Sequence, residues 1–277
     1  MQTQSDFFDV ERLIERSMPV RGLWVLGYAA GIILLVLISS AYFSEIHPAW
    51  SDAAGLLSTF VLVLIVLGML GMSVYANHRR RSEQLTLEAL EELIQLRRWQ
   101  EAAGVINQYL SKPTCTHMGR IQGLIYLSMI LMRYHQFEQA INVQNYIFEH
   151  VQLDPGTEYG VKLSRAMAML REDHLVDADR AIGELRRMSG GDSGALALLE
   201  LYRDVKTGHP AEAVEIFSSK LKAMKEQLGH RVADAYALGS KAMRMLGRTE
   251  EGEKLWEDAT TLVAANELVR RYPELAA

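Results

Sequence analysis

The sequence of 277 residues contains one cysteine, and after Ser82 it has no convincing alternation of polar and apolar residues. A single thiol, Cys115, excludes an intramolecular disulfide and is typical of a reducing compartment. Strands that are half buried need alternation with a period of two, whereas helices need a period near 3.6. The sequence therefore predicts an all-α fold.

Motifs for metal and nucleotide chemistry are also lacking. The eight histidines never occur four residues apart, and Cys115-Thr-His117 has no second ligand pair to complete a structural zinc site. Neither a G-x-x-x-x-G-K-[ST] loop nor a strand-linked G-x-G-x-x-G is present. We therefore expect no metal and no cofactor.

One short motif resembles a catalytic sequence but falls in an unsuitable place. Gly191-Asp-Ser-Gly194 matches the letters around the nucleophile of chymotrypsin-like serine proteases. That chemistry needs a β-barrel, an oxyanion hole and a positioned His–Asp pair. Here the letters lie between two predicted helices, with Asp192 as the expected N-cap. The sequence predicts that the chain is not an enzyme.

Charge of either sign is not in excess. The net charge is −5, and residues 77–277 carry 26 basic and 28 acidic side chains. A nucleic-acid-binding domain usually carries a clear basic excess. We therefore expect no nucleic-acid partner.

Two long apolar stretches dominate the N-terminal third. Residues 22–43 and 53–76 comprise 22 and 24 residues without a charged side chain or histidine. About 20 such residues cross a bilayer as a helix. They predict a transmembrane hairpin at 22–76 with a short external loop at 44–52, preceded by a leader at 1–21. A helical domain would follow at 77–277.

Arginines flank the predicted hairpin and are missing from its loop. Three precede the first stretch, and Arg79, Arg80 and Arg81 follow the second. Because basic residues remain on the cytoplasmic side, both termini are expected inside, in a membrane that we interpret as the bacterial inner membrane. The three consecutive arginines would also contact anionic lipid headgroups.

The leader is predicted to contain a short amphipathic helix, with Phe7, Val10 and Ile14 on one face and Pro19 at its end. This helix would lie either on the membrane surface or packed against the rest of the protein.

Gly27 and Gly31 are spaced for close helix packing. Their expected partner is the second stretch, through Gly68 and Gly71. The alternative is another membrane protein or a second copy of this chain, which would form a homo-oligomer.

A junction recurs five times after Ser82. At each one, an acidic or amide residue precedes a small residue in the first turn of a predicted helix, and the small residues are 35 to 39 positions apart. They are Ala102, Ala140, Ala178, Ala213 and Gly252. This period is typical of stacked helical hairpins, whose helices approach closely only where one offers a small side chain.

The pattern resembles the tetratricopeptide repeat (TPR) over about residues 82–265. Ser128, Ala166 and Ser240, twelve positions before their junctions, match the small position in the first helix of that family, whereas Leu90 and Leu201 do not. The resemblance implies an α-solenoid of about five helical hairpins. The expected pairs are 83–96 with 99–111, 117–133 with 137–151, 157–171 with 175–188, 193–206 with 210–228, and 231–246 with 249–271.

In TPR arrays the first helices of successive hairpins line a groove that receives a peptide or a helix. The resemblance implies a groove of methionine, tyrosine and long cationic side chains, which suits an apolar segment flanked by acids. Its candidate residues are Gln122, Met129, Arg133, Met167, Arg171, Tyr202, Lys206, Lys241 and Arg244. The alternative is that the methionines belong to the core and the cations to a solvated face.

The leading hypothesis is a membrane-anchored adaptor or scaffold that recruits protein partners through this groove. The alternative is a structural or assembly subunit of a larger membrane complex, docked through the hairpin. The sequence leaves open whether residues 266–277 occupy the groove.

Overall fold

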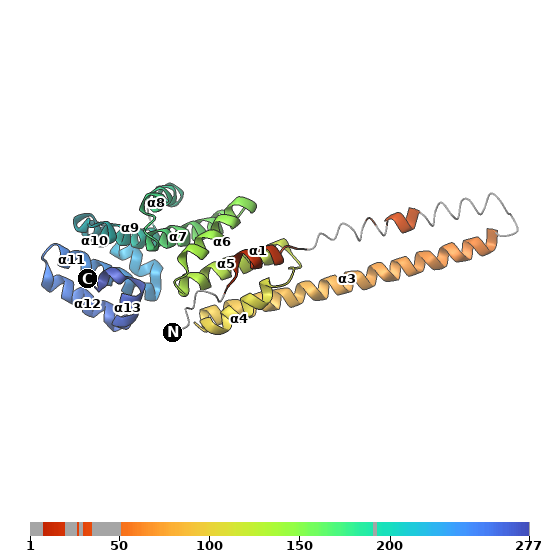
Figure 1. The fold of residues 1–277 in the computed structure, drawn as a ribbon, viewed down its shortest axis with the longest axis horizontal. Helices are drawn as coiled ribbons and strands as arrows, with labels where there is room; N and C mark the ends of the chain where they lie inside the picture. The colour runs from red at the N-terminus through yellow and green to blue at the C-terminus, as the bar shows by residue number, and fades with distance from the viewer. Residues whose placement is uncertain (1–7, 20–26, 28–29, 35–50, 191–192, 277) are drawn as a thin grey trace. The chain divides into compact units, whose positions relative to one another are not determined.

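A computed structural model describes residues 8–19, 27, 30–34, 51–190 and 193–276 (Figure 1). Over these residues the chain is all-α, with twelve α-helices, two short 3-10 helices and no strand. Its contacts divide it into two compact units, an N-terminal unit (Met1–Ile130) and a C-terminal unit (Leu131–Ala277). The predicted fold class is confirmed at this level.

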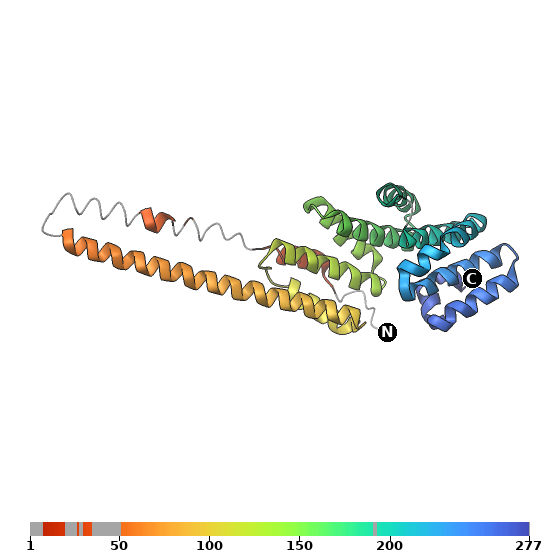
Figure 2. The ribbon, with the colours of Figure 1, turned by 180° about the vertical axis from the view of Figure 1, so that it is seen from behind.

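The N-terminal unit is formed by a long helix and shorter helices beside it. It comprises α1 (Val10–Arg16), α3 (Ser51–Gln95), α4 (Trp99–Leu110) and most of α5 (His117–Arg133). Helix α4 packs on both α3 and α1. Figures 1 and 2 show α3 as one uninterrupted helix that extends far beyond its contact with α4.

The prediction of a transmembrane hairpin is contradicted. Helix α3 runs without a break from Ser51 to Gln95, through the position of the expected boundary after Ala76, and carries Arg79–Arg81 on its exposed surface. Among the helices that the structure describes, none is both long enough and apolar enough to span a bilayer. Most of the first predicted span and residues 44–50 of the loop lie outside the described residues. The lack of a spanning helix among the described residues contradicts the predicted location in the bacterial inner membrane with both termini cytoplasmic.

The middle of α3 presents large apolar side chains on its surface. Phe60, Leu67, Leu70, Val74 and Tyr75 each expose 57–69% of their area. Extended exposed apolar surface usually marks a place where another molecule binds.

Residues 8–19 of the leader are packed within the N-terminal unit, which is one of the two predicted arrangements. The Arg120 guanidinium donates to the Ser17 hydroxyl (3.0 Å) and to the Ile14 carbonyl (2.7 Å). The Thr114 hydroxyl donates to the Ser17 carbonyl (2.8 Å). Phe8, Val10 and Leu13 are buried. Helix α1 is thus part of the folded unit and ends at Arg16, before Pro19.

The five predicted junctions share one turn geometry. A residue with positive φ follows the first helix, and the N–H of the next residue donates to the carbonyl five positions earlier (2.8–2.9 Å). This bond satisfies a free carbonyl at the helix end. The positive-φ residues are Arg97, His135, Asp173, Gly208 and Gly247. The two glycine turns were expected, whereas three turns place a side chain in a conformation that favours glycine.

The small residue of each junction is the fourth residue of its helix. Ala102, Ala140, Ala178, Ala213 and Gly252 are all buried, and the four alanines are fully inaccessible. At the last junction the Ser240 hydroxyl donates to the Gly252 carbonyl (2.6 Å), directly across the helix pair. The expected close approach of paired helices is confirmed.

The C-terminal unit is built from packed hairpins (Figures 1 and 2). Its helices include α6 (Phe137–His150), α7 (Pro155–Arg171), α8 (Leu175–Ser189), α9 (Gly194–Thr207), α10 (Pro210–Leu228), α11 (Val232–Met245) and α12 (Thr249–Leu262). Helices α7 and α8, α9 and α10, and α11 and α12 pack as pairs. The first helices also contact one another in order, α7 with α9 and α9 with α11.

Two helix starts in this unit are capped by short polar side chains. Asp154 accepts from the Thr157 N–H (3.0 Å) at the start of α7, as its Asp-Pro-Gly sequence predicts. The Ser193 hydroxyl accepts from the Leu196 N–H (3.3 Å) at the start of α9. The expected cap Asp192 and its neighbour Gly191 lie outside the described residues.

The last predicted helix is divided into two. Helix α12 ends at Leu262, Val263 is extended (φ −142°, ψ 136°), and α13 (Ala265–Arg271) and the 3-10 helix η4 (Pro273–Leu275) follow. The break lets the chain turn back and bury Leu268, which a straight continuation of the helix would not allow.

Replacing Gly194 by alanine tests the closest backbone approach between α9 and α10. The new Cβ would lie 2.8 Å from the Ala223 carbonyl oxygen and 3.0 Å from the Met224 Cα. Because backbone atoms cannot rotate away, we expect a loss of about 1–3 kcal/mol in unfolding free energy, measured by chemical denaturation. Gly183→Ala is the control, since its Cβ meets nothing within 4 Å, and it should gain about 0.5–1 kcal/mol. Equal effects of the two changes would contradict the close approach.

Candidate functional site

The C-terminal segment, defined as residues 264–276, folds back onto the helices that were predicted to line the groove. Leu268 is fully buried in a cluster with Ala233, Ala237 and Ala259 of α11 and α12. Tyr272 is 1% exposed, and its ring meets the Tyr202 ring edge to face, with centroids 5.0 Å apart. These two side chains anchor the segment by apolar burial.

An arginine is enclosed by aromatic rings at the centre of the site. The Arg171 guanidinium carbon lies 4.5 Å from the Tyr272 ring centroid, 5.1 Å from that of Tyr202 and 5.6 Å from that of Phe137. The negative face of an aromatic ring attracts a cation, and more strongly where water is excluded. One of the three rings, Tyr272, comes from the C-terminal segment.

Carboxylates of the segment meet the cations at both ends of this cluster. Glu274 Oε1 accepts from the Tyr202 hydroxyl (3.0 Å) and pairs with Lys206 Nζ (3.3 Å). Glu267 Oε1 pairs with Arg133 Nη1 (3.3 Å) and with Arg271 of the segment itself (2.7 Å). Partly buried pairs of this kind are screened less by salt than exposed ones.

A buried carboxylate on α11 holds the segment from the other side. Asp234, 1% exposed, accepts from Arg271 Nη1 (2.8 Å) and from the Tyr272 hydroxyl (3.3 Å). Burial, reinforced by the Asp234 charge, raises the pKa of Tyr272 to about 12. Burial also raises the pKa of Tyr202, against the opposing charge of Arg171. Both hydroxyls therefore keep their protons and act as donors near neutral pH.

Two buried polar atoms at this interface lack hydrogen-bond partners in the described part of the chain. Arg171 Nε and Glu274 Oε2 are buried, and neither has a hydrogen-bond partner among the described residues. A buried polar atom without a partner weakens the bound state.

Only four of the nine predicted groove residues contact the C-terminal segment. Arg133, Arg171, Tyr202 and Lys206 all contact the C-terminal segment. Met167 belongs to the core, and Arg244 stacks on Trp256 (5.8 Å). Lys241 is half-buried on α11. Gln122 and Met129 lie in the N-terminal unit.

Most of the first predicted span lies outside the described residues, so the packing role of Gly27 and Gly31 stays a prediction. A Cβ built on Gly27, Gly31, Gly68 or Gly71 meets nothing within 4 Å in the described part of the chain.

Sequence reasoning missed the residues that the segment contributes. These are Glu267, Arg271, Tyr272 and Glu274, together with Phe137 and Asp234 on the opposing helices. A signal was present, because Tyr272-Pro-Glu274 near the end of the chain is an apolar group beside an acid. That is the chemistry expected of a groove ligand.

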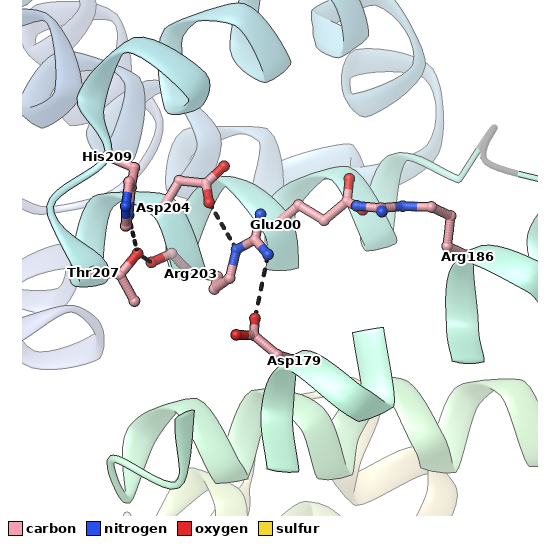
Figure 3. A network of polar contacts seen from close by, with 7 residues as sticks. All are labelled: Asp179, Arg186, Glu200, Arg203, Asp204, Thr207 and His209. Atoms are coloured by element: carbon pink, nitrogen blue, oxygen red, sulfur yellow. Dashed lines mark hydrogen bonds and ion pairs between the residues drawn. The ribbon is translucent and has the colours of Figure 1, made fainter. Parts of the chain in front are cut away.

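A second polar network ties α8 to α9 (Figure 3). Arg203 donates to Asp204 Oδ1 (2.7 Å) and to Asp179 Oδ1 (3.2 Å), and Arg186 Nε donates to Glu200 (3.0 Å). Asp204 is 3% exposed, and its Oδ2 has no hydrogen-bond partner in the described structure.

This network contains a threonine and a histidine but does not have the geometry of a catalytic triad. Thr207 Oγ1 lies 2.9 Å from His209 Nδ1 and donates to the Arg203 carbonyl within its own helix. Asp204 Oδ1 accepts from Arg203, whereas a triad needs the carboxylate to orient the histidine. The arrangement joins helices and closes a turn.

The N-terminal unit has a pocket of about 380 Å³ beside α3, α4 and the loop after α4. The buried Glu83 on its wall accepts from the Tyr109 hydroxyl (2.6 Å) and the Cys115 N–H (3.1 Å). Burial and the neighbouring Glu83 charge raise the pKa of the Cys115 thiol, which disfavours the reactive thiolate. The carboxylate therefore fastens the loop to α3.

Replacing Glu267 by glutamine tests the charge contribution to docking. The hydrogen bond from Arg271, with Arg133 nearby, holds the pKa of Glu267 below its usual range. The resulting stabilisation is present above the unfolded pKa of about 4.3 and is lost as pH falls through the lowered folded value. We expect Glu267→Gln to lower the unfolding free energy at pH 7. The difference between wild type and variant should shrink progressively as the pH falls below about 4.3.

The control for this change is Glu251→Gln, which removes an exposed pair with Arg248 and should have a smaller effect at pH 7. A Glu267→Gln difference that stayed constant down to pH 2.5 would contradict the ionic contribution.

Replacing Asp204 by asparagine tests the buried carboxylate of the second network. Burial raises the pKa of Asp204, although the hydrogen bond from Arg203 opposes this. The folded state therefore holds the proton more tightly, and stability is lost as pH rises from about 3.9 through the raised value. The unfolding free energy of the wild type relative to Asp204→Asn should decrease across that window. The exposed Asp179→Asn is the control, and a flat difference for Asp204→Asn would refute the burial effect.

Comparison with protein-family models, curated proteins and solved structures found no match to this chain. The contacts described above are therefore the basis for assigning a function.

Proposed function

We propose that this protein is a non-enzymatic adaptor or scaffold that binds a segment of a partner protein. The binding site is a groove on a TPR-like α-solenoid of about five hairpins. Its lining is formed by Arg133, Arg171, Tyr202 and Lys206, and the ligand is a peptide or helix with an apolar side chain between acids.

The repeated geometry supports the solenoid. Five equivalent turns place a small buried residue at the fourth position of the following helix, at intervals of 35 to 39 residues. Successive first helices α7, α9 and α11 also contact one another. This is the neighbour-to-neighbour stacking expected of a repeat protein.

The single observation that carries the binding function is the position of the C-terminal segment. A short, partly helical stretch of chain, with apolar side chains, Glu267, Glu274 and the two arginines Arg270 and Arg271, lies on four side chains that the sequence predicts as groove residues. A surface that holds such a segment within one molecule has the chemistry to hold a similar segment from another.

A subunit of a larger assembly is the alternative function, and the apolar middle of α3 favours it. Its exposed side chains would be covered by an apolar surface of a neighbouring subunit. This alternative predicts that polar substitutions at Leu67 and Leu70 release the partners, whereas groove substitutions do not.

The adaptor is tested by isolating the full-length protein with its partners from its own cells. Arg171→Gln combined with Lys206→Gln removes two of the three groove cations and leaves an uncharged polar side chain at each position. Tyr202 is left in place, because it is fully buried and its truncation would cost about 3–5 kcal/mol through a cavity. We expect the variant to retain less than about a tenth of the stoichiometric partner, as for the loss of a hot-spot pair.

The matched control is Arg180→Gln with Lys222→Gln, which removes two exposed cations on α8 and α10. It should retain the wild-type partners. The proposal would be refuted by partners that remain with the groove variant, or by their equal loss in both variants.

A further inference from the structure

We propose that the C-terminal segment is an internal ligand, and that the partner displaces it with a segment of the same chemistry. That chemistry is an aromatic side chain, a carboxylate two positions after it, and a second carboxylate about five positions before it. The inference rests on the proposed groove. It specifies which ligand the groove binds and how the C-terminal segment regulates that binding.

The segment is joined to the repeats as a separable element. Helix α12 ends at Leu262, and the extended Val263 precedes α13, a helix of seven residues. Such a short helix has little stability by itself, so its structure depends on the surface beneath it. Releasing it requires rotation at the break and leaves the α11–α12 pair unbroken.

The surface beneath the segment favours particular ligand side chains at particular positions. The ring of Tyr272 completes the enclosure of the Arg171 guanidinium, which an aliphatic residue could not do equally well. The Tyr202 hydroxyl and Lys206 together bind the Glu274 carboxylate, and Arg133 meets Glu267. A ligand therefore needs a ring at the position of Tyr272 and acids at the positions of Glu267 and Glu274.

The internal segment fits this surface incompletely. Arg171 Nε and Glu274 Oε2 are buried without hydrogen-bond partners among the described residues. A partner segment that offers one further acceptor to Arg171 would satisfy a donor that the internal segment leaves unpaired. This difference gives an external ligand an advantage over the internal one.

Competition sets the affinity that an external ligand can show. Its apparent dissociation constant is the intrinsic value divided by the fraction of molecules with an open groove. If the segment is docked in about 99% of molecules, weakening it increases apparent affinity by up to about 100-fold. The segment therefore restricts binding to ligands that match the groove well.

The test measures binding of a fluorescent peptide with the sequence of residues 264–276 to the full-length protein. Tyr272→Ala with Glu274→Ala weakens the internal segment, and we expect this variant to bind the peptide at least about tenfold more tightly than the wild type. Glu267→Gln with Glu274→Gln is a second, milder variant that keeps the buried ring, and it should shift affinity in the same direction. Hydrogen exchange of α7 and α9 confirms that each variant remains folded.

The specificity controls use both sides of the interface. In the Tyr272→Ala, Glu274→Ala background, adding Arg171→Gln should remove binding, whereas adding Arg180→Gln should leave it unchanged. A peptide that itself carries Tyr272→Ala should not bind. The inference is overturned if both weakened variants bind the peptide no better than the wild type, or if the Tyr272→Ala peptide binds equally well.

The outcome is separable from that of the adaptor test. Peptide binding without any cellular partner would support the internal ligand and count against the adaptor. Partners lost with the groove variant but retained equally by wild type and weakened variants would support the adaptor and overturn the inference.

Discussion

The close approach of two helices at one small residue is the constraint on which the repeated architecture depends. At each junction the fourth residue of the second helix is alanine or glycine and is buried. A larger side chain there would separate the helices and move the turn before it. The left-handed residue of that turn satisfies a free carbonyl and fixes the direction of the returning helix. Packing and turn geometry thus support each other at all five positions within the described ranges.

The C-terminal segment explains why cations on the first helices are partly buried. Removing a charge from water is costly unless an opposite charge or a polarisable ring replaces the solvent. Arg171 is enclosed by three rings, and Lys206 meets both Asp173 and Glu274. The compensation is incomplete, because a donor of Arg171 and an acceptor of Glu274 lack partners. Strong apolar anchoring at Leu268 and Tyr272 therefore coexists with polar contacts that are only partly satisfied.

Sequence patterns located helices best where local signals and packing agree. The ranges 117–133 and 210–228 were predicted with the bounds that α5 and α10 have. The change of polarity after Ala76 does not end a helix, because a helix continues until a turn stops it. Between Ser73 and Leu96 there is no glycine or proline, and α3 ends only at the turn around Arg97. The predicted final helix, 249–271, was wrong because no local signal marks the break at Val263. That break allows Leu268 to be buried against α11 and α12.

The sequence by itself determined the all-α class, the spacing of the junctions and four of the side chains that the C-terminal segment contacts. These features are encoded locally, in small residues, helix caps and a repeating period. Only the tertiary structure decided what covers those four side chains, because Glu267, Tyr272 and Glu274 are distant in sequence from Arg133 and Arg171. It also decided that the leader packs into the N-terminal unit, since the partners of Ser17 lie about a hundred residues further along the chain. Contacts over such separations depend on how hairpins stack, which no local pattern specifies.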